Sequence, residues 1–211
     1  MPLAWLLLVV AGAASAPAGH AATTPSIPPE LAAMAAKMRE VRSLTARVRQ
    51  EKELAALTEV VRNDGRFAFE RPRRLEMDLD GPGGTRLVID GDTMAMTYKG
   101  VGRTERMQLS RDPRARAVAE HLFLLLDADP TELAKIYRLH VLQAKPLRVR
   151  LEPIAEALAG IIAHVDADLD PRGFVSMITI VEANGDRTVW RFDAPTLNAA
   201  VPPQRFALPP S

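Results

Sequence analysis

The sequence predicts a mainly β fold with helices (α+β), in which an open, strongly curved antiparallel barrel is covered by helices. Three observations favour this class. Short strand-like runs separated by turn signals recur along most of the chain. Between residues 110 and 139 this spacing gives way to helical spacing. Strands and helices do not alternate one by one, and no internal repeat is present, which argues against a parallel α/β fold.

The first residues are typical of a cleavable secretory signal peptide. An apolar run precedes a stretch of small residues, with candidate cleavage sites after Ala16 and Ala21. The second site is favoured, because Pro17 would lie next to the first. The apolar run is shorter than the roughly 20 residues that span a bilayer, although no Lys or Arg precedes it. We therefore expect residues 1–21 to be a signal peptide, rather than a buried helix, and residues 22–211 to form a single domain.

The composition excludes several kinds of site. The 211 residues contain no cysteine, which removes disulfides, thiolate chemistry, cysteine-ligated metals and the lipid attachment point of a bacterial lipoprotein. The formal net charge is +1, whereas a nucleic-acid-binding protein would favour a strongly basic face. Clusters of arginine do occur, and we interpret them as solvated strand and helix faces. We expect no nucleic-acid partner.

In the N-terminal half, one helix precedes a series of strands. The helix is predicted over Glu30–Arg42, because the two prolines before it suit a first helical turn. A strand around Leu44–Val48 follows, and Asn63-Asp64-Gly65 is predicted to be a turn. Further strands are predicted at Phe67–Glu70, Arg74–Asp80, Arg86–Ile89, Thr93–Lys99 and Thr104–Leu109.

These strands carry large, soft apolar side chains at alternate positions. Such alternation predicts that one face of the sheet meets something apolar and the other meets water. Methionine is frequent on the apolar side, and because it adapts to irregular shapes it hints at a ligand cavity there. Taken by themselves, the methionines favour the alternative, ordinary core filler. The residues concerned are Phe67, Phe69, Leu75, Met77, Leu79, Leu87, Ile89, Met94, Met96 and Tyr98.

Helices interrupt the strands in the second half. Asp112-Pro113 is a helix start, with aspartate as the cap and proline in the first turn. Apolar residues, among them Leu122 and Leu125, cover much of this helix, so we expect it to bury two sides. A second, short helix is predicted from Asp129-Pro130 through Ile136. Strands are predicted again at Tyr137–Gln143, Leu147–Leu151, Ile161–Leu169, Phe174–Glu182, Arg187–Phe192 and Arg205–Leu208.

No set of catalytic or metal-binding residues is recognisable. His121, His140 and His164 each stand without a second ligand at helical or strand spacing, and no nucleophile, phosphate-loop or zinc motif occurs. The aspartates at 166, 168 and 170 resemble the start of a calcium loop, but Pro171 occupies the position that requires glycine. We interpret them as residues of a strand end, and we expect no enzymatic activity, no cofactor and no metal.

Five segments, taken in order, carry a resemblance to a known family. They are the N-terminal helix with the strand through Arg47-Val48-Arg49-Gln50, then Gly65–Pro72, Leu87–Asp92 followed by Met96 and Tyr98, Val165–Phe192, and Pro203–Pro210. The chain resembles the LolA family of periplasmic carriers of outer-membrane lipoproteins. It departs from that family at Met77 and Met96, where the family often has Trp, and Ser110–Leu139 matches none of its motifs.

The resemblance implies an open barrel, lidded by helices, around an apolar cavity. A carrier of this kind is periplasmic and monomeric. It takes acylated lipoproteins from an inner-membrane LolCDE-type ABC transporter and passes them to an outer-membrane LolB-type acceptor. The resemblance places Arg71 where the family's arginine bonds to the lid and helps to govern closure. It places Leu75 at a position that helps to engage partners, and Val48 at a cavity-facing position.

The function that we expect is therefore the shuttling of lipoproteins between membranes, with their acyl chains held in the cavity. The alternative is a LolA-like lipid- or lipoprotein-binding or sensing module that takes no part in general lipoprotein sorting. A secreted enzyme is the third hypothesis. The candidate cavity and lid residues are Val48, Phe67, Phe69, Arg71, Leu75, Met77, Leu87, Ile89, Met94, Met96, Leu122 and Leu125.

Overall fold

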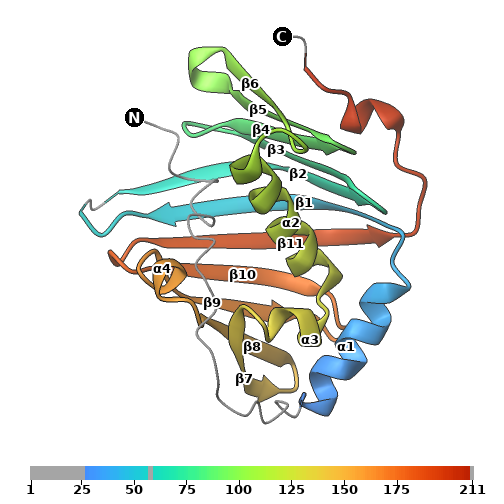
Figure 1. The fold of residues 1–211 in the computed structure, drawn as a ribbon, viewed down its shortest axis with the longest axis vertical. Helices are drawn as coiled ribbons and strands as arrows, with labels where there is room; N and C mark the ends of the chain where they lie inside the picture. Colours follow the sequence, from blue (N-terminus) through green and yellow to red (C-terminus); the bar gives the residue numbers. More distant parts are fainter. Residues whose placement is uncertain (1–26, 57–58, 210–211) are drawn as a thin grey trace.

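Eleven antiparallel strands form one sheet in the computed structural model, which describes residues 27–56 and 59–209. Their order is β6-β5-β4-β3-β2-β1-β11-β10-β9-β8-β7, so β6 and β7 are the edges and the sheet is not closed (Figure 1). This confirms the predicted fold class. The strands are β1 Ser43–Glu53, β2 Val60–Glu70, β3 Arg74–Asp80, β4 Thr85–Asp90, β5 Thr93–Tyr98, β6 Arg103–Gln108, β7 Tyr137–Ala144, β8 Leu147–Pro153, β9 Ile162–Leu169, β10 Val175–Glu182 and β11 Arg187–Leu197.

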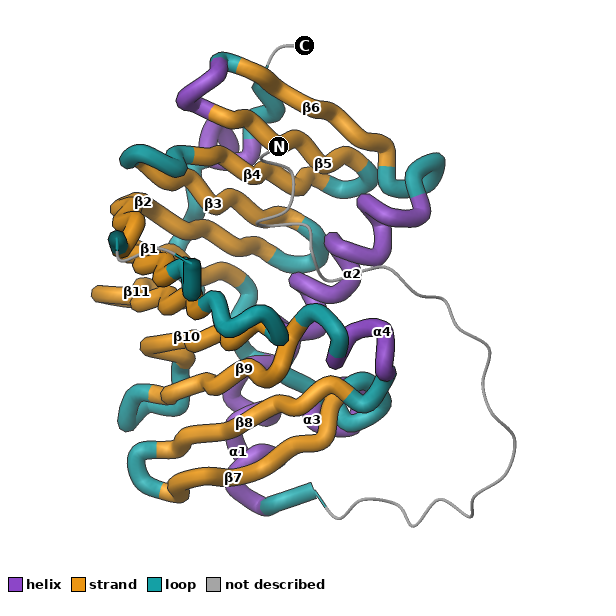
Figure 2. The backbone as a smooth tube through the Cα atoms, turned by 90° about the vertical axis from the view of Figure 1, so that its left-hand side faces the viewer, coloured by secondary structure: helices purple, strands orange, loops and turns teal. Residues whose placement is uncertain are grey.

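Helices cover one face of this curved sheet. They are α1 (Pro29–Arg39), α2 (Pro113–Asp127) and the single turn α3 (Pro130–Leu133) (Figures 1 and 2). As predicted, Asp112 caps α2: its carboxylate accepts hydrogen bonds from the backbone N–H groups of Arg114 and Ala115 at 2.9 and 3.0 Å. The cap fixes where α2 begins, and therefore which of its side chains face the sheet.

Much of the half of the sheet formed by β2–β6 packs against α2. Phe69, Ile89 and Met94 have no exposed surface, and they belong to one apolar cluster with Ala119 and Phe123 of α2. Burying a side chain of this size contributes about 1.5–3 kcal/mol. The methionine-rich stretch therefore supplies much of a filled core on this side.

A second apolar cluster lies in the other half of the sheet. Leu31 of α1 and Leu133 of α3 pack there with Tyr137 and with side chains of β8 and β9. Ile178 and Ile180 of β10 contact both clusters. The strip of sheet around β10 is thus where the two halves of the interior meet.

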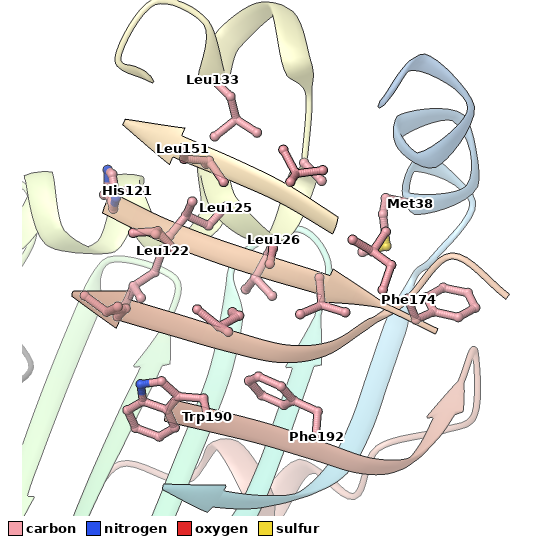
Figure 3. Close-up of a pocket in the computed structure, with 18 of the residues that line it drawn as sticks. Met38, His121, Leu122, Leu125, Leu126, Leu133, Leu151, Phe174, Trp190 and Phe192 are labelled. Carbon is pink, nitrogen blue, oxygen red and sulfur yellow. The ribbon is translucent and has the colours of Figure 1, made fainter. Parts of the chain in front are cut away.

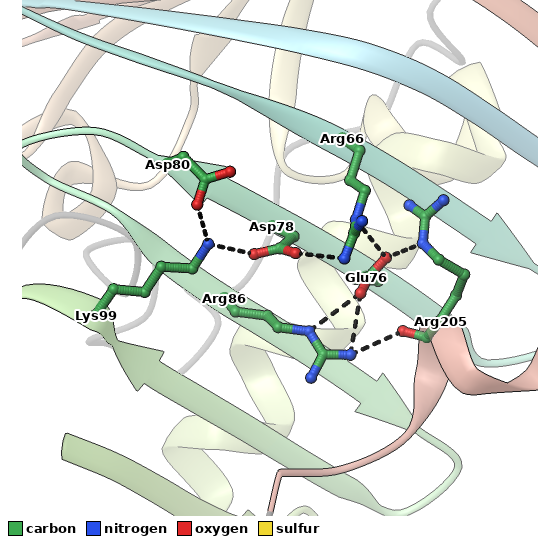
Figure 4. Close-up of polar contacts among 7 residues, drawn as sticks. All are labelled: Arg66, Glu76, Asp78, Asp80, Arg86, Lys99 and Arg205. Atoms are coloured by element: carbon green, nitrogen blue, oxygen red, sulfur yellow. Dashed lines mark hydrogen bonds and ion pairs between the residues drawn. The ribbon is translucent and has the colours of Figure 1, made fainter. Parts of the chain in front are cut away.

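The central part of the opposite face of β3 and β4 is covered rather than exposed to water, which differs from the prediction. The C-terminal segment crosses it, and its short 3-10 helix η2 (Pro203–Phe206) packs on both strands. Glu76 of β3 is completely buried beneath it, 3.0 Å from the guanidinium of Arg86 and in contact with that of Arg205 (Figure 4). The strand predicted at Arg205–Leu208 is therefore wrong, because these residues form a covering turn that is anchored by an ion pair.

The turn predicted at Asn63-Asp64-Gly65 is also wrong. These residues lie inside β2, which runs without interruption from Val60 to Glu70. A Cβ at Gly65 would lie 2.0 Å from the carbonyl oxygen of Asp78 on the neighbouring strand. The glycine allows a close approach of two backbones inside the sheet instead of reversing the chain.

Smaller differences concern the helical segments. The helix predicted through Ile136 ends at Leu133, and the next residues lead into β7. Two short elements were not predicted, α4 (Glu156–Ala159) and the 3-10 helix η1 (Lys99–Val101). The predicted signal peptide, residues 1–21, lies outside the described residues. Within the described ranges, no helix combines the length and the apolar character needed to cross a membrane.

Candidate functional site

A cavity of about 300 Å³ lies between the helices and the sheet (Figure 3). Its volume is at the lower end of the roughly 300–1,000 Å³ that is typical of ligand pockets. Helices α1, α2 and α3 supply one wall, and the other wall comes from β1–β4 and β7–β11. The site therefore draws on both halves of the sheet.

The strand side of the cavity follows from simple alternation. Ile178 and Ile180 on β10, and Trp190 and Phe192 on β11, all line it. Successive side chains of a strand point to opposite faces, so residues two apart share one face. Thr179 and Arg191, which lie between these residues in sequence, are not among the lining residues. Two neighbouring strands thus give the cavity an aromatic and aliphatic floor.

The helical side is equally apolar. Leu122, Leu125 and Leu126 of α2 line the cavity, at the spacing that places side chains on one face of a helix. Met34 and Met38 of α1 complete this wall. Such a surface can bind hydrocarbon without specific polar contacts, because burial of apolar area is favourable and non-directional.

Polar side chains gather at one end of the cavity. Tyr137 begins β7 and pairs with Pro153 at the end of β8, while Glu182 ends β10 and pairs with Ile162 at the start of β9. These positions share one end of the sheet, and Thr188, near the start of β11, lies there too. Tyr137, Glu182 and Thr188 all line the cavity.

The opposite end is apolar. Met38, Leu169 and Phe174 line it, and Figure 3 places Met38 and Phe174 far from His121, which lies on the side of the polar end. The cavity therefore has a direction, with polar side chains at one end and apolar side chains at the other.

His121 and Tyr137 form a hydrogen-bonded pair at the polar end. The Tyr137 hydroxyl lies 2.8 Å from Nε2 of His121, and their rings are 5.7 Å apart between centroids. Burial lowers the pKa of His121 to about 4 and raises the pKa of Tyr137. Both groups are therefore uncharged at neutral pH. The sequence shows His121 as an isolated histidine, because its partner lies on another element.

Glu182 at the same end is also shifted toward its neutral form. Burial raises its pKa, and the nearby Asp186 acts in the same direction, while Lys52 opposes the shift. Burial also lowers the pKa of Lys52. A low local dielectric thus extends to the rim of the cavity.

Of the predicted cavity residues, half line this cavity and most of the others lie in the core. Phe67, Leu75, Met77, Leu87, Leu122 and Leu125 line the cavity. Val48, Phe69, Ile89, Met94 and Met96 are buried instead in the cluster that packs against α2. Leu75, which the resemblance places at a partner-engaging position, is only 2% exposed.

Arg71 joins the sheet to the ends of two helices. Its guanidinium donates to the carbonyl oxygens of Val41 and Met38, just after and within α1, at 2.8 and 3.3 Å. It also donates to the carboxylate of Asp127, the last residue of α2, at 2.5 Å. The resemblance implies a lid contact at this position, and the control of closure by Arg71 stays a prediction. One side chain thus holds the C-terminal ends of both covering helices.

Sequence reasoning missed the lining residues of the second half of the sheet. Trp190, Phe192, Ile178, Ile180 and Tyr137 all line the cavity. The alternation in β10 and β11 was present in the sequence and could have indicated them. It could not have indicated that β10 and β11 would lie across the cavity from α2, because that depends on the pairing of β1 with β11.

The aspartates at 166, 168 and 170 are held by arginines. Asp166 accepts two hydrogen bonds from Arg150 at 2.7 and 2.8 Å, and this contact holds its pKa below the usual range. Asp168 accepts one hydrogen bond from Arg148, at 3.1 Å, two residues along the strand pair. Within the residues that the structure describes, no group of three or more acidic or histidine side chains is arranged to hold a metal ion.

Comparison with known proteins gives one family match. The model of the family described as outer membrane lipoprotein carrier protein LolA matches residues 39–209. A search of curated proteins finds no match.

Solved structures of similar fold include a LolA superfamily protein from Nitrosomonas europaea, with 12% identity and a TM-score of 0.41 over 84% of this chain and 97% of that one. The lipoprotein LppX of Mycobacterium tuberculosis has 13% identity and a TM-score of 0.47 over 84% of this chain and 99% of that one. The complex of MucA and MucB from Pseudomonas aeruginosa gives 14% identity and a TM-score of 0.48 over 86% of this chain and 60% of that one.

Proposed function

Because the chain belongs to the LolA family of outer membrane lipoprotein carrier proteins, we propose that it is a periplasmic carrier that holds the acyl chains of lipoproteins in its cavity. In this proposal the signal peptide directs export. The carrier, a monomer, receives its cargo from a LolCDE-type transporter of the inner membrane. It delivers the cargo to a LolB-type acceptor of the outer membrane.

The observation that carries the proposal is the apolar cavity under the helices. Its walls are leucine, isoleucine, methionine and aromatic side chains, apart from the polar end. A buried methylene contributes about 0.8 kcal/mol when it leaves water. A carrier exchanges cargo with bilayers, however, so its cavity has only to approximate hydrocarbon. A cavity wall of flexible apolar side chains can bind acyl chains and still release them.

The Arg71 contacts supply a latch of suitable strength. A hydrogen bond to a charged group contributes about 1.5–3 kcal/mol. A few such bonds hold α1 and α2 over an empty cavity, and whole acyl chains that enter the cavity can displace them. Closure and cargo entry can therefore compete, which a shuttle requires.

The test is whether the protein removes lipoproteins from a membrane. Inner-membrane vesicles that contain a tagged lipoprotein and the transporter are incubated with the purified protein and ATP, and the soluble fraction is analysed for the tagged lipoprotein. We expect a soluble complex with the carrier. A protein that stays empty in this assay, and that carries no lipid by mass spectrometry when isolated from the periplasm, contradicts the proposal.

A matched pair of variants locates the cargo. Leu125→Arg places a charge in the cavity, and we expect it to abolish the soluble complex, because an unpaired charge in apolar surroundings is costly. Leu142→Arg makes the same change at a leucine that is 47% exposed on β7, and it should leave release unchanged. Equal activity of the two variants would place the lipid elsewhere. Binding without transfer to the acceptor would favour the alternative, a binding or sensing module.

A further inference from the structure

We propose that His121 and Tyr137 form a hydrogen-bonding subsite for the uncharged carbonyl group, ester or amide, of a bound acyl chain. The hydrocarbon of that chain then extends toward Met38 and Phe174. The inference rests on the proposed function and adds an orientation: it states which end of the lipid lies at which end of the cavity.

The first argument is the number of hydrogens. A neutral imidazole carries one N–H and a phenol one O–H. The single bond between Nε2 of His121 and the Tyr137 oxygen uses one of these two donors, whichever group donates. Among the residues that the structure describes, no further hydrogen bond to either side chain is found. One donor is therefore left over in either tautomer.

The second argument is the surroundings of the pair. Both side chains line the cavity; Tyr137 is only 1% exposed, and His121 is partly buried. A donor that is buried in apolar surroundings without an acceptor costs free energy, so a ligand that supplies an acceptor gains affinity. An acyl carbonyl lies directly at the end of its hydrocarbon chain, and its oxygen accepts hydrogen bonds without carrying a charge.

The charge of the site selects an uncharged ligand group. Burial keeps both members of the pair neutral at pH 7. Glu182 lines the same end of the cavity, so a carboxylate or phosphate placed there would meet a second acidic group. A fatty acid anion or a lipid phosphate therefore fits less well than an ester or an amide.

The direction of the cavity gives the orientation. From the polar end, Leu122, Leu125 and Leu126 form a continuous apolar row, and Met38 and Phe174 lie beyond it (Figure 3). A chain whose carbonyl meets Tyr137 can lie along this row without passing another polar lining group. The reverse orientation would place the carbonyl among apolar side chains and leave the donor unpaired.

The experiment compares two probes that differ only in the ester group: methyl palmitate and a straight-chain hydrocarbon of equal length. Trp5 lies in the proposed signal peptide, so in the processed protein Trp190 is the only tryptophan; it lines the cavity, and its fluorescence therefore reports occupancy. We expect the protein to bind the ester about three- to tenfold more tightly, the effect of one hydrogen bond.

The double variant His121→Leu/Tyr137→Phe should bind both probes with similar affinity, because both polar partners are removed together. The matched control is His140→Leu/Tyr98→Phe, which makes the same two changes at residues that do not line the cavity. The control should keep the preference for the ester. The subsite is overturned if His121→Leu/Tyr137→Phe still binds the ester more tightly than the hydrocarbon. It is also overturned if the unmodified protein shows no such preference.

A spectroscopic measurement needs no variant. The infrared band of a carbon-13-labelled ester carbonyl moves to lower frequency when the oxygen accepts a hydrogen bond. We expect that shift in bound methyl palmitate, and a band at the position seen in hydrocarbon solvent would contradict the subsite. If neither probe binds, the carrier function itself fails. If both bind equally, the carrier function stands and only the subsite fails.

Discussion

The guanidinium of Arg71 lies 2.5 Å from the carboxylate of Asp127, so a turn of the sheet is bonded to the last residue of α2. The two side chains are 31% and 45% exposed, and an ion pair in such a position contributes about 0.2–1 kcal/mol. The same guanidinium also reaches two backbone carbonyls at the end of α1. Those bonds join a charged donor to neutral acceptors, and they contribute more of the free energy that holds the helices to the sheet than the ion pair does.

Replacement of Arg71 should separate cargo binding from cargo transfer. In Arg71→Leu both helices lose their tie to the sheet, and we expect stability to fall by about 2 kcal/mol. The cavity walls are unchanged, so lipoprotein should still be released from inner-membrane vesicles. Transfer to the acceptor should fall, because the open and closed forms no longer differ by these bonds. The control Asp127→Asn should lower the stability by less than about 1 kcal/mol. If Arg71→Leu transfers cargo normally, Arg71 is a surface residue without a role in transfer.

The buried histidine predicts a pH dependence of stability. His121 has a pKa of about 4 in the folded chain, against an ordinary value of 6.5. Between these values the unfolded chain binds the additional proton, so stability falls as the pH drops from about 6.5 to about 4 and then levels off. The loss is at most about 3 kcal/mol.

Urea unfolding at a series of pH values measures this contribution. The variant His121→Phe should lack it, whereas His140→Asn, at a half-exposed position of β7, should keep it. An equal pH dependence of the unmodified protein and His121→Phe would show that His121 is accessible to water in the folded chain.

The buried carboxylate of Glu76 should be one of the most sensitive positions outside the cavity. It is completely buried and is bound by Arg86 and Arg205. Removing one partner of a buried ion pair costs about 3–5 kcal/mol, because the other charges stay behind. We expect Glu76→Gln to lower stability by this amount and to loosen the C-terminal segment, measured by hydrogen exchange. Asp80→Asn, at an 80% exposed carboxylate of the same strand, should change stability by less than about 1 kcal/mol.

Gly65 should tolerate no side chain. A Cβ there would lie 2.0 Å from a backbone oxygen of Asp78, so the two strands would have to separate. We expect Gly65→Ala to cost about 3 kcal/mol or more, at the upper end of the usual cost of overpacking. Gly100→Ala is the control, because a Cβ at that position meets nothing within 4 Å. Thermal unfolding of the two variants distinguishes a packing requirement from a general effect of losing glycine.

The strand pattern of the chain could be predicted because alternation and turn residues are local signals. Arg74–Asp80, for example, was predicted with the bounds that the structure has. The cap at Asp112 was likewise readable, because aspartate is a preferred helix cap and proline suits the first turn. Gly65 misled for the same reason: a local rule connects Asn-Asp-Gly with turns, and only the position of β3 shows why glycine is there.

The site could be predicted only in part. The alternation of Phe67, Leu75 and Leu87 correctly indicates one apolar face, yet it cannot say which part of that face meets a helix and which part meets a void. That division depends on where α2 crosses the sheet, a long-range property. The sequence likewise does not indicate that Tyr137 is the partner of His121, since this bond joins a helix to the first residue of a strand and depends on how the two pack.

Because the edge strands β6 and β7 do not pair with each other, the sheet can widen around the cavity. A closed barrel has a circumference set by its ladder of backbone bonds, and widening it would break that ladder. Here a modest flexing of the twisted sheet about its central strands would spread the two rims apart without the loss of an interstrand bond. Under the proposed function, the capacity of the cavity then depends on how firmly the helices are fastened, and one unchanged scaffold accommodates cargoes with different numbers or lengths of tails.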